Sequence, residues 1–130
     1  KPNKNLYTDR ALYTPDVIFN KDNKIVQADI ITCASPNWTA ARKWNVSQVE
    51  NTLVLAQRIQ FIKEIAENET VDVLILGAWG CGVFGQNPRT VARLFDFIFR
   101  ETDIKNIIYA IPGGLNSDNF KAFDECIRKS

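Results

Sequence analysis

An apolar run followed by a glycine-rich loop is the feature that most constrains the fold of this chain. Residues 71–76 (VDVLIL) are almost entirely apolar, as in a strand of a parallel sheet that is buried on both faces. The loop at residues 77–85 (GAWGCGVFG) holds four glycines in nine residues. Asn87 and Pro88 then predict a helix start, with a capping side chain first and proline at the first helical position. This order predicts one strand–loop–helix unit of an α/β fold.

Two more helices are predicted by their caps and their apolar periodicity. Ser47 and Glu50 have the spacing of a capping box. After them, apolar residues recur every three or four positions, which is typical of a helix that lies against a sheet. This apolar stripe comprises Val49, Leu53, Ala56, Ile59, Ile62 and Ala66. Near the carboxyl terminus, Ser117 or Asp118 can cap a last helix, whose apolar residues are Phe120, Phe123 and Ile127.

Further strands are predicted by short apolar runs between turn residues. Residues 17–19 and 24–26 flank a polar turn and predict a hairpin. Residues 28–34 and 106–111 are apolar runs that end at Ser-Pro-Asn and Pro-Gly-Gly. Strands that alternate with helices predict an α/β fold with a mixed, mostly parallel sheet flanked by helices. Because the sequence has neither an internal repeat nor a linker, we expect residues 1–130 to form a single domain.

The composition excludes several classes of function. With 16 basic and 15 acidic residues, a nucleic-acid-binding footprint is not expected, and no apolar run is long enough for a membrane span. The absence of histidine excludes Ser–His, Cys–His and His-ligated metal chemistry within this chain, so we expect no metal and no cofactor. Three widely spaced cysteines predict neither a zinc site nor a disulfide framework, and they favour a reducing cytoplasm. Since the chain has no methionine, we expect it to be a fragment or a processed product.

Three loops follow the predicted strands, and ligands of parallel sheets bind at that edge. They are residues 35–38, 77–85 and 113–116. In the middle loop, glycines allow the backbone amides to approach a ligand, and the next helix adds positive potential, which favours a phosphate or diphosphate. The alternative is a tight turn whose glycines serve packing alone. Residues 80–85 also match the dinucleotide pattern G-x-G-x-x-G, but the helix begins past the last glycine and no acidic residue ends the next strand.

The side chains of the loop offer little catalytic chemistry. Cys81 has no histidine to activate it, so a small side chain in a crowded turn is the better interpretation. Trp79 and Phe84 could pack on a sugar or a base, or could belong to the core. From the residues alone, the sequence predicts a phosphate-binding loop without a recognisable catalytic acid or base.

Four segments of the chain, in order, resemble the carboxyl-terminal part of the microbial-type poly(ADP-ribose) glycohydrolase family. They are YTDRALYTPDVIF, ADIITCASPNW, VDVLILGAWGCGVFGQNP and IIYAIPGGLNSDNFKAF. The resemblance covers nearly the whole chain and implies a macrodomain-like fold that is incomplete on its amino-terminal side. Where the family more often has Ser-Pro-Ala-Pro-Asn, residues 33–37 read Cys-Ala-Ser-Pro-Asn, which is a departure in that loop.

The resemblance implies that ADP-ribose or poly(ADP-ribose) is the ligand, with its diphosphate held by the glycine loop. Ser35 and Asn37 are then expected at the rim of the pocket, and Asn116 near the adenosine end. The missing amino-terminal segment or a second copy of the chain would be a further partner. The residues expected to contact the diphosphate and ribose are Gly80, Cys81, Gly82, Val83, Phe84 and Gly85, with Trp79 beside them.

The catalytic signature of the family is absent from this chain. That signature, a Gly-Gly-Gly segment followed by Gln-Glu-Glu, supplies the glutamate that protonates the leaving ribose oxygen. The sequence therefore predicts an ADP-ribose-binding domain related to hydrolases and leaves open whether the intact protein is an enzyme. A non-catalytic reader of ADP-ribose or a related nucleotide signal is the main alternative. The third is an interaction domain whose loop only packs.

Overall fold

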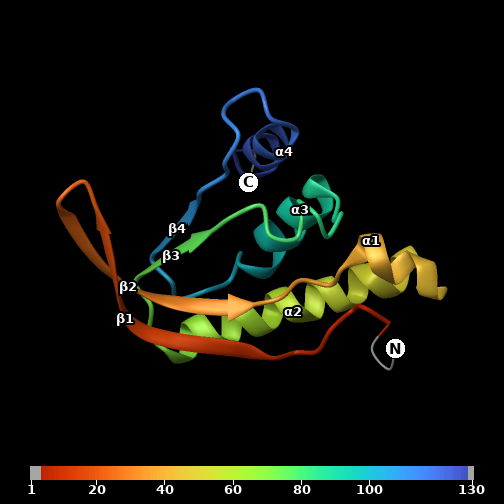
Figure 1. Ribbon diagram of the computed structural model, residues 1–130, viewed down its shortest axis with the longest axis horizontal. Helices are drawn as coiled ribbons and strands as arrows, with labels where there is room; N and C mark the ends of the chain where they lie inside the picture. The colour runs from red at the N-terminus through yellow and green to blue at the C-terminus, as the bar shows by residue number, and fades with distance from the viewer. Residues whose placement is uncertain (1–3, 129–130) are drawn as a thin grey trace.

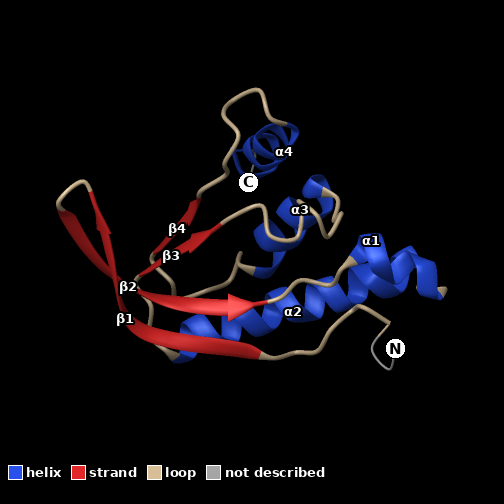
Figure 2. Ribbon diagram, in the orientation of Figure 1, coloured by secondary structure: helices blue, strands red, loops and turns tan. Residues whose placement is uncertain are grey.

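The protein folds as alternating strands and helices, which confirms the predicted α/β class (Figures 1 and 2). The computed structural model describes residues 4–128. None of the helices in this part of the chain is long and apolar enough to cross a membrane. The elements are β1 (Ala11–Lys21), β2 (Lys24–Cys33), α1 (Trp38–Ala41), the 3₁₀ turn η1 (Arg42–Trp44), α2 (Gln48–Asn68), β3 (Val73–Leu76), α3 (Pro88–Ile98), β4 (Asn106–Tyr109) and α4 (Asp118–Arg128).

The strands form two separate pairs. β1 and β2 make the predicted hairpin, which is longer than expected because the run at 28–34 continues β2 instead of forming its own strand. The turn residues Asp22 and Asn23 both have positive φ, at 52° and 62°, as a two-residue hairpin turn requires. β3 and β4 are parallel, with Val73 paired to Asn106. The predicted mixed arrangement is present, but it is divided between two sheets in residues 4–128.

An open slot separates the two pairs, with β2 on one side and β3 on the other. Its volume is about 780 Å³, and its lining includes every residue of 26–31 and of 71–77. Successive side chains of a strand point to opposite faces. Because consecutive residues of both strands line the slot, each strand faces it with its unpaired edge and not with one face. The indole Nε1 of Trp79 donates to the Cys33 carbonyl at 2.9 Å, so both strands end at the same end of this β2–β3 slot.

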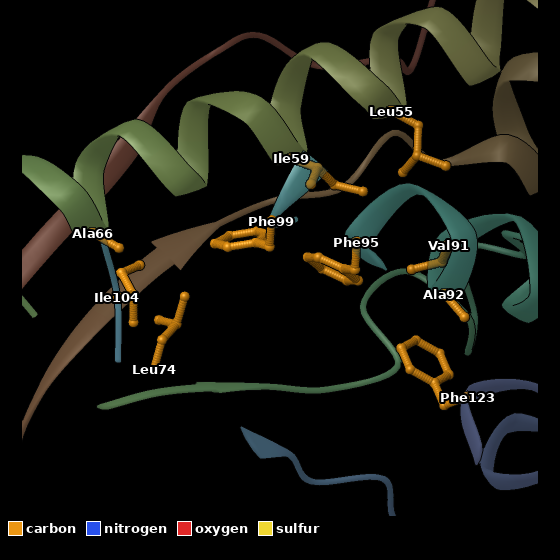
Figure 3. Packing of buried hydrophobic residues seen from close by; sticks show 10 residues of the cluster. All are labelled: Leu55, Ile59, Ala66, Leu74, Val91, Ala92, Phe95, Phe99, Ile104 and Phe123. Carbon is orange, nitrogen blue, oxygen red and sulfur yellow. The ribbon is translucent and has the colours of Figure 1, made fainter. Parts of the chain in front are cut away.

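The hydrophobic core lies between α2, α3 and one face of β3 (Figure 3). Phe95 is at its centre, with ring centroids of Trp79, Phe99, Tyr109 and Phe123 between 6.1 and 6.5 Å away. The buried apolar residues of this core are Leu55, Ile59, Ala66, Leu74, Val91, Ala92, Phe95, Phe99, Ile104 and Phe123. α3 begins at Pro88, just after the glycine loop, and its residues Val91, Ala92 and Phe95 anchor it in this core.

The predicted caps are present, since Ser47, Asn87 and Ser117 each accept a backbone N–H of the helix that follows. Two burial predictions are wrong. Val49 and Leu53 on α2 are 71% and 59% exposed. The first turns of α2 instead turn polar side chains inward, toward loops that supply their hydrogen-bond partners.

The second wrong prediction concerns β3, which is buried on one face only. Leu74 is buried, whereas Val73 and Ile75 are 49% and 65% exposed. In residues 4–128 the core packs against the Leu74 face of the strand, and the buried cluster does not include the opposite face. An apolar run alone does not reveal which of its two faces finds a covering layer.

Candidate functional site

The glycine loop lies against α1 and the loop that leads from β2 to it, at the carboxyl ends of both strands. The backbone N–H of Thr39 donates to the Phe84 carbonyl at 3.1 Å. The Thr39 hydroxyl donates to the Val83 carbonyl at 3.0 Å, and the Gln86 amide donates to the Pro36 carbonyl at 2.8 Å. Two of the three predicted ligand loops are therefore joined into one structure.

Two of the loop glycines are required by close contacts. Gly80 and Gly85 have φ of +76° and +70°, a region that side-chain-bearing residues rarely adopt. A Cβ at Gly80 would lie 2.4 Å from the Ser35 hydroxyl, and one at Gly85 would lie 2.3 Å from the Thr39 hydroxyl. The packing interpretation therefore explains these two glycines.

Gly82 differs, because neither strain nor contact requires a glycine there. A Cβ at this position would meet no atom within 4 Å. Gly82 is exposed, and its neighbour Val83 is 87% exposed. A glycine on the open side of a loop leaves room for a ligand to approach the backbone.

Three consecutive backbone amides of the loop are available as donors. Within residues 4–128, the N–H groups of Gly82, Val83 and Phe84 donate no hydrogen bond, while the Gly85 N–H donates to the Gly82 carbonyl at 3.0 Å. Successive unpaired amides in a turn form an anion-binding concavity. The loop can therefore hydrogen-bond anionic oxygens through its backbone.

The amino-terminal end of α3 contributes positive electrostatic potential to the site more than free N–H donors. The Asn87 side chain accepts from the amides of Arg89 and Thr90, at 2.9 and 3.2 Å. These two amides are therefore satisfied within the helix, although the helix dipole still favours negative charge near this end. Hydrogen bonds to an anion would come from the loop.

The two aromatic residues of the loop have different surroundings. The indole of Trp79 is fixed by its bond to Cys33, and its ring contacts Phe95, so it is part of the core wall. Phe84 is half-buried and its ring centroid lies 5.8 Å from that of Tyr7. Phe84 and Tyr7 thus form an aromatic pair beside the free amides.

Cys81 has the environment of an inert thiol. It is half-buried, burial raises its pKa to about 11, and its Sγ donates weakly to the Trp79 carbonyl at 3.7 Å. A reactive cysteine needs a lowered pKa, so these surroundings favour the small-side-chain interpretation. No group of histidine, cysteine and acidic residues within residues 4–128 could hold a metal ion.

The remaining predicted site residues occupy different places. Ser35 is 2% exposed and lies directly under Gly80. Asn37 caps α1, since its side chain accepts the Ala40 N–H at 3.1 Å. Asn116 is exposed in the loop between β4 and α4, and within the described residues no hydrogen bond joins it to the glycine loop. Ligand contacts by these three residues stay predictions.

Sequence reasoning missed Thr39, Asn51, Arg58 and Gln86. Arg58 is 1% exposed and donates to Asp9 and to the carbonyls of Leu6 and Ala34. The one available signal was the position of Gln86, directly after Gly85, the last glycine of the loop. The partners of the other three residues are too far away in sequence to be recognised from spacing.

Comparisons with known proteins place this fold beside bacterial poly(ADP-ribose) glycohydrolases. The enzyme from Deinococcus radiodurans in complex with ADP-ribose superposes with a TM-score of 0.85 at 28% identity, over 96% of this chain and 55% of that chain. The enzyme from Thermomonospora curvata bound to the inhibitor ADP-HPD gives 0.81 at 27% identity, over 93% of this chain and 50% of that chain. The resemblance to this family, predicted from the sequence motifs, is confirmed.

The similarity is one of structure more than of recognisable sequence. No family model matches the chain, and no curated protein sequence matches it. The chain spans about half the length of the solved structures that it matches.

Proposed function

We propose that this domain binds ADP-ribose, alone or as a unit of poly(ADP-ribose), with the diphosphate on the glycine loop. The observation that carries this proposal is the run of three unpaired amides at Gly82, Val83 and Phe84. They lie between Gly80 and Gly85, two glycines with positive φ at which a Cβ would collide with Ser35 or Thr39. The bound ADP-ribose and ADP-HPD of the similar bacterial enzymes support the ligand class.

The loop residues divide the recognition of this ligand between backbone and side chains. The amides hydrogen-bond the phosphate oxygens, and the small residues Gly80, Cys81 and Gly85 allow the backbone to curve around them. Phe84 and Val83 pack beside the ribose, with Trp79 forming the wall behind. Ser35 and Asn37 shape the rim from the neighbouring loop, and Asn116 reaches the adenosine end.

Hydrolysis of ribose–ribose bonds is assigned to the complete protein and not to these residues. The chain contains neither the Gly-Gly-Gly nor the Gln-Glu-Glu segment that the resemblance implies for catalysis. A glycosidase needs a positioned carboxylic acid to protonate the leaving oxygen. A non-catalytic reader of ADP-ribose is the second candidate, and turnover of poly(ADP-ribose) by the complete protein separates the two.

We also propose a macrodomain-like fold and a cytoplasmic location. The three cysteines are all unpaired, which suits a reducing compartment. Inert, half-buried thiols such as Cys81 are consistent with cysteines that serve packing.

Isothermal titration of the chain with ADP-ribose tests the proposal, with AMP and NAD as comparison ligands. We expect ADP-ribose to bind selectively, and Gly82→Glu to abolish that binding because it places a negative charge beside the free amides. Gln57→Glu, on the exposed side of α2, adds the same charge elsewhere and should bind normally. Equal binding by Gly82→Glu and the unaltered chain would remove the loop from the site.

A further inference from the structure

The buried polar side chains of this protein gather around the two joined loops. Among residues 4–128 they are Asn5, Ser35, Asn51, Arg58 and Gln86. The rest of the core is apolar. Burying an amide costs free energy unless its hydrogen bonds are fully made, so a polar cluster under one loop needs a reason.

Asn51 and Gln86 form a reciprocal amide pair beneath the glycine loop. Asn51 Nδ2 donates to Gln86 Oε1 and Gln86 Nε2 donates to Asn51 Oδ1, both at 2.9 Å. Each residue is 4% exposed. The same Gln86 Nε2 also donates to the Pro36 carbonyl at 2.8 Å. One side chain therefore connects α2 to the loop that follows β2.

The backbone of Gln86 fixes the base of the glycine loop. Its N–H donates to the Gly80 carbonyl at 2.9 Å, so residues 80 and 86 close a short ring of chain. The free amides of Gly82, Val83 and Phe84 lie within that ring. The side chain of Gln86 therefore holds the ring at its base, and the open side carries the donors.

An apolar pair of the same shape would fill this space equally well. Replacing both partners of a buried hydrogen bond by apolar groups is often nearly neutral for stability. An apolar pair would not hold the loop in one orientation relative to α2 and Pro36, because apolar contacts lack the directional geometry of hydrogen bonds.

We infer that Asn51 and Gln86 are positioning residues that hold the glycine loop so that its free amides are in place before the diphosphate arrives. The inference rests on the proposed function for its ligand. Neither side chain contacts the ligand, since both are buried and their hydrogen bonds are used within the protein.

The test is a double-mutant cycle of near-isosteric variants, Asn51→Leu, Gln86→Met and the two combined. Melting temperature and ADP-ribose affinity are measured for each. Each single variant removes the two hydrogen bonds of the amide pair and leaves polar atoms of the remaining buried amide without a partner, so it should melt at a lower temperature. The combined variant removes both amides, and the Pro36 carbonyl keeps the Ser35 hydroxyl at 3.3 Å as a donor, so most of the melting temperature should return. Its Kd for ADP-ribose should nevertheless stay at least about tenfold raised, which corresponds to 1.4 kcal/mol. Gln57→Met on the exposed side of α2 should change neither quantity.

Recovery of affinity together with melting temperature would overturn the inference, because a purely structural pair predicts that the two move together. Should the combined variant not fold, Asn51→Ala leaves room for water in the amide site and serves in its place. Its Kd should also rise at least about tenfold in a sample shown to be folded, and an unchanged Kd would again overturn the inference.

A second measurement keeps the test separate from the proposed function. NMR order parameters of the Gly82, Val83 and Phe84 amides should be near 0.85 in the unaltered chain and below about 0.6 in the combined variant or its substitute. Unchanged order parameters would overturn the positioning role whether or not ADP-ribose binds. Absence of binding by the unaltered chain would instead contradict the proposed function.

Discussion

The carboxyl ends of β2 and β3 are tied together, whereas the strands themselves stand apart. At the ends, Trp79 bonds to Cys33, Gln86 to Pro36 and Thr39 to Val83. Along the strands, an open slot of about 780 Å³ separates two unpaired edges. The order of the candidate site thus comes from side chains and loop backbone, and it does not require a continuous sheet beneath it. Four changes test this difference between the joined ends and the separated strands.

Of the four changes, Gly80→Ala should lower the free energy of unfolding most, because Gly80 lies where the two loops are joined. The new methyl would lie 2.4 Å from the Ser35 hydroxyl, on a backbone with φ of +76°. We expect a loss of roughly 2–4 kcal/mol in the free energy of unfolding, measured by urea denaturation. Gly82→Ala is the matched control and should change the stability by less than about 0.5 kcal/mol. Equal losses in the two variants would contradict the contact-based explanation.

Arg58→Met removes the donor that ties the amino-terminal segment to the end of β2. The carbonyls of Leu6 and Ala34 would lose their hydrogen bonds, at a cost of about 1–3 kcal/mol in chemical denaturation. Arg89→Met breaks an exposed ion pair with Glu125 and should cost about 1 kcal/mol or less. If the two substitutions were equivalent, the buried guanidinium would not be anchoring the segment.

Alkaline pH should lower the free energy of unfolding through the thiol of Cys81, which lies in the glycine loop. Burial raises its pKa from 9.0 to about 11, so between these values the unfolded chain loses the thiol proton first. The unfolded state then binds fewer protons than the folded one, and the free energy of unfolding falls as pH rises. Denaturation from pH 8 to 11 should show a smaller fall for Cys81→Ala than for the unaltered chain. Parallel curves would mean that Cys81 does not contribute.

Ile75→Thr should change the free energy of unfolding least, because Ile75 is an exposed residue of β3, away from the joined loops. Its side chain is 65% exposed, so we expect a change within about 0.5 kcal/mol in the free energy of unfolding. Leu74→Ala, one residue earlier and buried, should cost about 2–5 kcal/mol. Sedimentation should also show less self-association for Ile75→Thr, since an exposed apolar face tends to associate with other chains.

Local chemistry made part of this structure predictable. Asn87-Pro88, Ser47 and Ser117 act within three residues of themselves, so their caps could be recognised from spacing. The glycine loop was recognisable for the same reason. Asn51 and Arg58 could not be recognised, because their partners lie 35 and 52 residues away. The exposure of Val49 and Leu53 follows from the same cause, since Asn51 faces inward at the start of α2 and leaves these two neighbours on the outer side.

The hydrogen bond from Trp79 to the Cys33 carbonyl also gives the protein a fluorescent reporter at the candidate site. This indole lines the β2–β3 slot, immediately precedes Gly80, and is hydrogen-bonded and partly shielded from water. Trp38 and Trp44 lie outside the slot lining, on α1 and η1. With those two replaced by phenylalanine, the emission wavelength and quenching of a single native fluorophore would report both on a molecule entering the slot and on a ligand settling on the loop.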